Sequence, residues 1–123
     1  MAQVHHFRAK VTWTGAARGT TSSYESYSRD HVTEVPGKPP LPGSADQVFR
    51  GDASRHNPED LLVVSLSTCH MLTYLAEAAR AGIHVVAYSD EASGTMQVMV
   101  TPLPLETDDV PEPGGQVIDG PAV

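Results

Sequence analysis

The sequence predicts an α+β fold in which antiparallel strands come first and one long helix follows. Residues 7–13 alternate apolar and polar side chains with the period of a half-buried strand. Residues 57–82 are mostly apolar and are bounded by helix start and stop signals. Residues 101–123 are acidic and rich in proline, a composition typical of a disordered tail.

The strands are expected in the N-terminal half. Residues 7–13 form the first, and the Gly-containing stretch 15–19 supplies a turn. Residues 20–35, rich in Thr, Tyr and Val, form the second, which completes a hairpin. Residues 36–46 contain several Pro and Gly and are predicted to be a loop, and residues 47–52 a short extended segment.

The helix has clear ends. Asn57 is a good N-cap, Pro58 suits the first helical position, and Gly82 is a C-terminal stop. A span of about 24 residues is roughly 36 Å long. Residues 61–66 are apolar nearly all round, which predicts a central helix that is buried on most sides.

After the helix, residues 83–88 alternate like a strand, and residues 96–106 are expected to continue a meander. The predicted organisation is therefore one domain over residues 1–100 and a disordered tail over residues 101–123.

Charge and motifs exclude several classes of function. The chain has a net charge of −7, and no basic residue follows Arg80, so no basic patch is expected for nucleic acid. No apolar run approaches the roughly 20 residues of a membrane span, and no signal peptide is visible. A single cysteine fits the reducing cytoplasm. The six histidines show no metal-ligand spacing, and no cofactor motif occurs, so neither a metal nor a cofactor is expected.

Four stretches resemble the OsmC/Ohr family, the osmotically inducible and organic hydroperoxide resistance proteins, and fit its OsmC-like branch. They are TWTG (12–15), SSYESYSRDH (22–31), GKPPLPGSADQVFRGD (37–52) and HNPEDLLVVSLSTCHMLTYLAEAARAGI (56–83). The resemblance covers residues 6–95 and implies a thiol-dependent peroxidase for organic hydroperoxides, active in stress defence. It also implies an intertwined homodimer with its active sites at the interface.

The chain departs from the family after residue 95. Family members continue with further strands, a second long helix and a second cysteine that resolves the first. Here an acidic, Pro-rich segment without cysteine stands in that place. The C-terminal part of the family pattern is thus atypical or missing. A sulfenic acid would then need an external thiol or dihydrolipoyl reductant.

The resemblance implies a site made of Cys69, Glu59 and an arginine. Cys69 would be the nucleophile, because a thiolate cleaves the O–O bond and becomes a sulfenic acid. Arg29 is the first choice for its cationic partner, with Arg18 and Arg50 as alternatives, and Glu59 would orient the arginine. Each has a simpler interpretation: a buried core cysteine, solvated surface charges, and an acid that suits the helix dipole.

Helix geometry constrains this site. Glu59 and Cys69 are ten residues apart, about 15 Å along one helix. If both serve one site, Glu59 comes from the partner chain. His70 points away from Cys69 and is given no catalytic role.

The apolar surroundings of Cys69 favour an organic over an inorganic peroxide. They consist of Leu62, Leu66, Leu72 and Tyr74. A different function stays open, a catalytically degenerate OsmC-like module that dimerises or binds an apolar ligand. The missing second cysteine favours this alternative.

Overall fold

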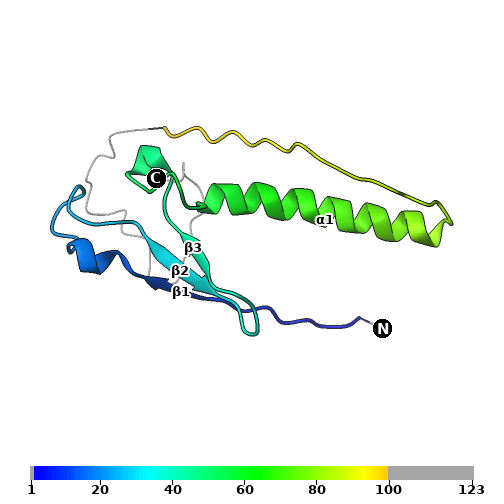
Figure 1. Ribbon diagram of the computed structural model, residues 1–123, viewed down its shortest axis with the longest axis horizontal. Coiled ribbons are helices and arrows are strands. Elements are labelled where there is room, and N and C mark those ends of the chain that lie inside the picture. The colour runs from blue at the N-terminus through cyan, green and yellow to red at the C-terminus, as the bar shows by residue number, and fades with distance from the viewer. Residues whose placement is uncertain (1, 100–123) are drawn as a thin grey trace, which may run out of the picture. The chain divides into compact units, whose positions relative to one another are not determined.

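The computed structural model of the protein describes residues 2–99. The chain divides into one unit of residues 1–93 and another of residues 94–123. The first unit holds the strands β1 (Lys10–Trp13), β2 (His31–Glu34) and β3 (Leu41–Gly43), and the helix α1 (Pro58–Arg80), as Figure 1 shows. It also holds two short 3-10 helices, η1 (Gly15–Arg18) and η2 (Gln47–Phe49). The predicted α+β class is confirmed.

The strands form one antiparallel sheet in the order β1-β2-β3. Lys10 lies opposite Glu34 and Trp13 opposite His31, so an opposite-charge pair faces across the first ladder. At the other ladder, Gly43 lies opposite His31. A Cβ atom on Gly43 would run into the His31 ring, so glycine is the residue that fits here.

The sheet corrects several predictions. The expected hairpin forms as β1 and β2, but both strands are shorter than predicted, and their side chains are exposed or half-buried. β3 lies inside the predicted loop 36–46, because its backbone pairs with the free edge of β2. Residues 47–49 form η2 instead of an extended segment, and the Asp46 side chain caps it by accepting from Val48 N at 2.9 Å.

Helix α1 begins and ends where the sequence predicts. The Asn57 side chain accepts from Asp60 N at 2.8 Å, and the Asp60 carboxylate accepts from Asn57 N at 3.3 Å, which makes a complete capping box. Pro58 takes the first position. Gly82 has a φ of 72°, the left-handed conformation that ends many helices.

The predicted burial of α1 is wrong for the single chain. Among the hydrophobic side chains of residues 2–99, only Ala78 is buried. Leu62 and Leu66 are 61% and 66% exposed. The physical reason is that α1 packs along none of the three strands and extends away from the sheet (Figure 1). The apolar character was read correctly from the sequence, but no element of this unit covers it.

Residues 83–93 run back beside α1 without forming the predicted strand. Ile83 N donates to Ala78 O at 2.8 Å, and Ser67 Oγ donates to the Asp90 carboxylate at 2.7 Å. The rings of Tyr74 and Tyr88 lie 5.7 Å apart. A helix satisfies its own backbone groups and offers no free edge for pairing, so an extended neighbour gains no ladder.

The unit of residues 94–123 is described only over residues 94–99, which form neither helix nor strand. Most of the expected meander over residues 96–106 and the whole predicted tail, 101–123, lie outside the described residues. The domain boundary expected after residue 100 stays a prediction.

The start of α1 is fixed to the loop that follows β3. Ser44 is fully buried; its N–H donates to His56 O at 3.0 Å, and its Oγ accepts from Asp52 N at 3.0 Å. Asn57 Nδ2 donates to the Asp46 carboxylate at 3.4 Å. These bonds tie residues 44–57 together, so the loop and the first turn of the helix form one ordered piece.

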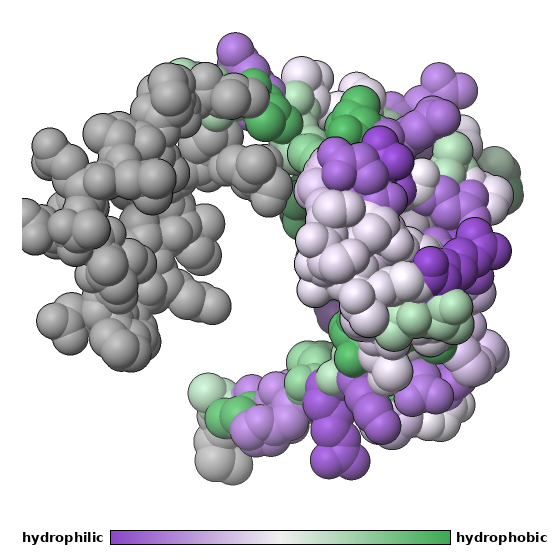
Figure 2. All heavy atoms as spheres, turned by 90° about the vertical axis from the view of Figure 1, so that its left-hand side faces the viewer, coloured by the Kyte–Doolittle hydropathy of each residue, from purple (hydrophilic) through white to green (hydrophobic). Residues whose placement is uncertain are grey.

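By length and composition alone, α1 is also long and apolar enough to cross a membrane. The exclusion of such a span on sequence alone did not take this helix into account. A core helix of a soluble protein passes the same test, so this is weak evidence. The rest of the unit is different in character. Figure 2, which faces the loop end of the molecule, shows hydrophilic and near-neutral side chains there with apolar ones scattered between them.

Candidate functional site

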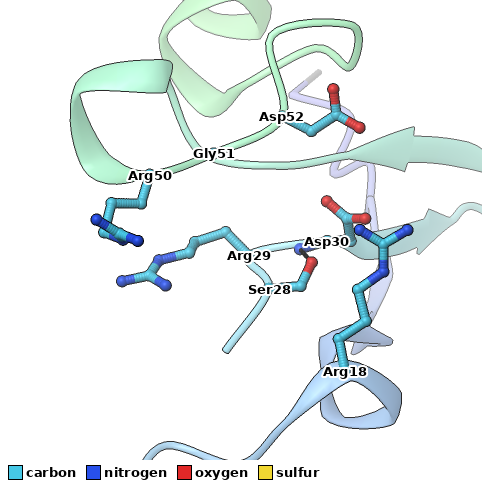
Figure 3. A pocket seen from close by; sticks show the side chains of 7 residues that line it. All are labelled: Arg18, Ser28, Arg29, Asp30, Arg50, Gly51 and Asp52. Carbon is cyan, nitrogen blue, oxygen red and sulfur yellow. Dashed lines mark hydrogen bonds between the residues drawn. The ribbon is translucent and has the colours of Figure 1, made fainter. Parts of the chain in front are cut away.

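The three arginines that the sequence offered as alternatives meet at one hollow. Arg18, Arg29 and Arg50 come from η1, from the segment before β2 and from the end of η2. The hollow has a volume of about 250 Å³ and is called the arginine pocket below (Figure 3). Its other lining residues are Ser28, Asp30, Gly51 and Asp52.

Arg29 is held tightly by its own loop. Its guanidinium group lies 3.7 Å from the ring centre of Tyr27 and 4.5 Å from that of Tyr24. It also donates to the main-chain oxygens of both tyrosines. The loop is in turn fixed to β1, because Trp13 Nε1 donates to Ser28 O at 2.8 Å and Thr14 N to Asp30 O at 3.0 Å. Arg29 therefore has a defined position before any ligand arrives.

Arg50 is placed by an unusual backbone conformation. Its φ is +64°, and its N–H donates to Gln47 O at 3.0 Å. The following Gly51 has its Cα so close to Ala45 O that a Cβ atom could not fit. Figure 3 shows Arg50 and Arg29 extending toward the same side of the pocket, while Arg18 rises from η1 toward Asp30.

The two carboxylates of the pocket share a cation from outside the lining. Arg55 lies 3.8 Å from the Asp30 carboxylate and 3.9 Å from that of Asp52. Hydrogen bonds from the hydroxyl and N–H of Ser54 lower the pKa of Asp52, with smaller contributions from the charges of Arg55 and Arg18. The surroundings of Asp52 therefore favour its charged form.

Cys69 lies apart from the arginines. It is exposed in the middle of α1, and no residue of α1 lines the arginine pocket. Helical spacing puts Cys69 on the same side as Leu62 and Leu66, which are both exposed. We call Leu62, Leu66 and Cys69 the helix stripe. Within one chain, the structure does not bring the predicted nucleophile to any of its three candidate arginines.

Glu59 occupies the first turn of α1 and is half-buried. Its Oε2 atom is buried and accepts no hydrogen bond from the described residues. Buried polar atoms are normally paired, so this oxygen stands out. Glu59 forms no ion pair with Arg29 in the part of the chain that the structure describes.

A second hollow, of about 330 Å³, borders the first because Arg29 lines both. Its walls are mainly apolar, and we call it the tryptophan hollow. Besides Arg29 it is lined by Trp13, Thr21, Tyr27, His31, Ser44, Ala45 and Pro58. Over residues 2–99, no three His, Cys, Asp or Glu side chains lie where they could hold a metal ion.

Sequence reasoning gave no role to Asp52 in the lining of the arginine pocket or to its partner Arg55 outside it. Their spacing of three residues within the turn FRGDASR is a local signal that could have indicated the pair. The contact of Arg55 with Asp30 had no such signal, because it joins segments far apart in the sequence.

Comparison with known proteins gives one informative match. No family model matches the chain, and no curated protein does. Among solved structures, the chain is similar to an OsmC-like protein of unknown function from Vibrio cholerae O1 biovar eltor, with a TM-score of 0.70 and 29% sequence identity. The match covers 79% of this chain and 65% of the other, so the chain spans about two thirds of that protein.

This similarity confirms the predicted resemblance, which rested on sequence motifs, by an independent comparison of three-dimensional structure. The chain is therefore similar to the OsmC-like family in its sequence motifs and in its fold.

Proposed function

We propose that the protein is a thiol-dependent peroxidase that reduces organic hydroperoxides at Cys69, in the cytoplasm and as a homodimer. The observation that supports this most directly is the position of Cys69. The thiol is exposed on an apolar side of a helix, between leucines that could contact an alkyl chain. A thiol with no access to solvent would have pointed to a core residue instead.

The proposed reaction needs one cysteine and an external reductant. The thiolate of Cys69 attacks the distal oxygen of the hydroperoxide; the O–O bond breaks, and the alkoxide takes up a proton to leave as an alcohol. An external dithiol, such as a dihydrolipoyl group, then attacks the sulfenic acid and releases water. Its second thiol displaces Cys69 from the mixed disulfide, which restores the thiol and leaves an oxidised dithiol.

A second copy of the chain is part of this proposal. Arg29 and Cys69 do not meet within one chain, and Glu59 lies about 15 Å from Cys69 along the helix axis. Association through the helix stripe would cover the exposed leucines and could bring Arg29 and Glu59 of one chain to Cys69 of the other. Arg29 would then favour the thiolate and the departing alkoxide, and Glu59 would hold the arginine in place.

The test is intact-mass spectrometry of the reduced protein after mixing with a stoichiometric alkyl hydroperoxide or with hydrogen peroxide. We expect one oxygen atom to be added at Cys69 at least about tenfold faster than to free cysteine, and faster with the alkyl peroxide. Cys69→Ser should take up no oxygen on this timescale. Arg29→Gln should slow the oxidation while the circular dichroism spectrum stays unchanged.

The result that contradicts the proposal is a Cys69 thiol that reacts no faster than free cysteine in a protein shown to be dimeric by light scattering. The same rate in a monomer would instead locate the failure in assembly. Mixing Cys69→Ser with Arg29→Gln chains separates these cases further. If the site combines residues of two chains, half of the mixed dimers' sites pair an intact Cys69 with an intact Arg29.

A catalytically degenerate module that binds an apolar ligand is the second candidate, favoured by the tryptophan hollow. An apolar ligand seated there would contact Trp13, the single tryptophan of the chain. Titration with a neutral alkyl alcohol should then change the tryptophan fluorescence at saturating concentrations, with no oxidation of Cys69 required. An unchanged signal would remove this candidate.

A further inference from the structure

The arginine pocket gathers positive charge in a chain that is acidic overall. The sequence has eight Lys and Arg residues against fifteen Asp and Glu, a net charge of −7. Half of these cations lie in or beside the pocket: Arg18, Arg29, Arg50 and Arg55. Only Asp30 and Asp52 oppose them in its lining. The negative net charge already keeps an acidic chain soluble. Solubility therefore does not explain why four arginines are concentrated at one place.

The ion pairs of the two aspartates are made by Arg55, which lies outside the lining of the pocket. Arg55 lies between the carboxylates of Asp30 and Asp52, at 3.8 and 3.9 Å. Arg18, Arg29 and Arg50 make no ion pair with any carboxylate of residues 2–99. Arg55 thus makes the ion pairs of both acids; Arg18 acts on Asp52 only as a more distant charge, and Arg29 and Arg50 pair with no carboxylate among residues 2–99.

Two of these arginines are held in place by the chain, Arg29 by favourable contacts and Arg50 by a strained backbone conformation. Arg29 is stacked between Tyr24 and Tyr27, and its bonds to their main-chain oxygens use two of its five N–H donors. Arg50 is the only non-glycine residue among residues 2–99 with a positive φ. Backbone strain of this kind is concentrated at functional sites, where it aims a side chain.

We propose that the arginine pocket binds a small oxyanion, a phosphate or carboxylate group, with Arg18, Arg29 and Arg50 as its hydrogen-bond donors. The planar fork of a guanidinium group matches the oxygens of both groups. The volume of about 250 Å³ admits such a group together with several waters, each of which occupies roughly 30 Å³. The inference rests on the pocket alone and does not require Cys69 to be reactive.

Inorganic phosphate is the first probe, titrated into the full chain at constant ionic strength with chloride as the balancing anion. Trp13 reports binding, because its ring lies edge-on to Tyr27 at 6.1 Å and Tyr27 stacks on Arg29. Isothermal calorimetry measures the same equilibrium without a reporter. Acetate and a phosphate monoester, titrated in the same way, distinguish a carboxylate from a phosphate ligand.

The decisive variant is the double substitution Arg18→Gln with Arg50→Gln. Its matched control is Arg8→Gln with Arg80→Gln, which removes the same charge from exposed positions outside the pocket. We expect the first to weaken phosphate binding at least about tenfold, as the loss of a charge-assisted hydrogen bond would, and the control less than about twofold. Circular dichroism verifies that each variant is folded.

Equal weakening in the two double variants would overturn the proposal, because it would mean that phosphate responds only to net charge. Phosphate binding to the unmodified chain no stronger than chloride binding would overturn it as well, and needs no variant. Because neither measurement involves a peroxide, the oxyanion site and the peroxidase can fail independently of each other.

Discussion

The loop-and-strand region of residues 10–57 and the helix α1 differ in whether their side chains find partners within one chain. In the first region polar groups find partners nearby: Trp13 Nε1 bonds to Ser28 O, Ser44 is buried between His56 and Asp52, and Arg29 is enclosed by its own loop. In α1 the backbone groups are hydrogen-bonded and the first turn is capped, but most of its large apolar side chains are exposed.

The difference teaches which part of the molecule is complete in one chain. A hydrogen bond is directional and joins only two groups, so the polar groups of this region can be paired by single partners within residues 10–57. An apolar surface stabilises the fold only when it is removed from water. Covering a whole helix face requires a second helix or sheet of comparable area. In proteins, most of the stability of a helix comes from packing of its apolar face against other elements. The exposed helix thus needs cover, and the proposed dimer supplies it.

The largest effect is expected from acidic residues in the helix stripe. Leu62→Glu with Leu66→Glu should turn a dimer into a monomer and reduce the helical circular dichroism signal. Each leucine would otherwise contribute about 1.5–3 kcal/mol when fully covered. Val48→Glu, at an equally exposed apolar residue on η2, is the control and should change neither property. A double variant that stays dimeric would show that the stripe is not the interface.

An intermediate effect is expected in the loop region from Gly51→Ala. The new Cβ would collide with Ala45 O, so the turn that positions Arg50 has to shift, and we expect a loss of about 2–4 kcal/mol in urea unfolding. Gly37→Ala is a useful contrast. It has open space around it but a φ of +77°, so only backbone strain of about 1 kcal/mol is expected. Equal losses at the two glycines would mean that the loop is not closely packed.

The smallest effect is expected at the junction of the two regions. Asn57→Ala removes the side-chain half of the capping box and should cost about 1 kcal/mol of unfolding free energy, with faster amide exchange in the first turn. Asn57→Ser keeps a capping oxygen and should lose much less. A loss in Asn57→Ser as large as in Asn57→Ala would assign the effect to the bond with Asp46 rather than to the cap.

Local signals made the helix predictable, and non-local pairing limited the rest. Asn57, Pro58 and Gly82 mark the ends of α1 within a few residues of sequence, and the structure agrees. The strand Leu41–Gly43 was missed because only the free edge of β2 makes it a strand. The alternation in residues 83–88 was misread as a strand, because a pattern of side chains does not say whether a helix or a sheet lies beside it.

The candidate site divides in the same way. The residues able to do chemistry were visible in the sequence: one cysteine, a first-turn glutamate and three arginines, in motifs that resemble the OsmC-like family. Only the tertiary structure brings Arg18, Arg29 and Arg50 to one pocket and leaves Cys69 on a separate, uncovered helix. The reason is physical: helix caps and apolar character act over a few neighbouring residues, whereas a pocket depends on which distant segments the folded chain places side by side.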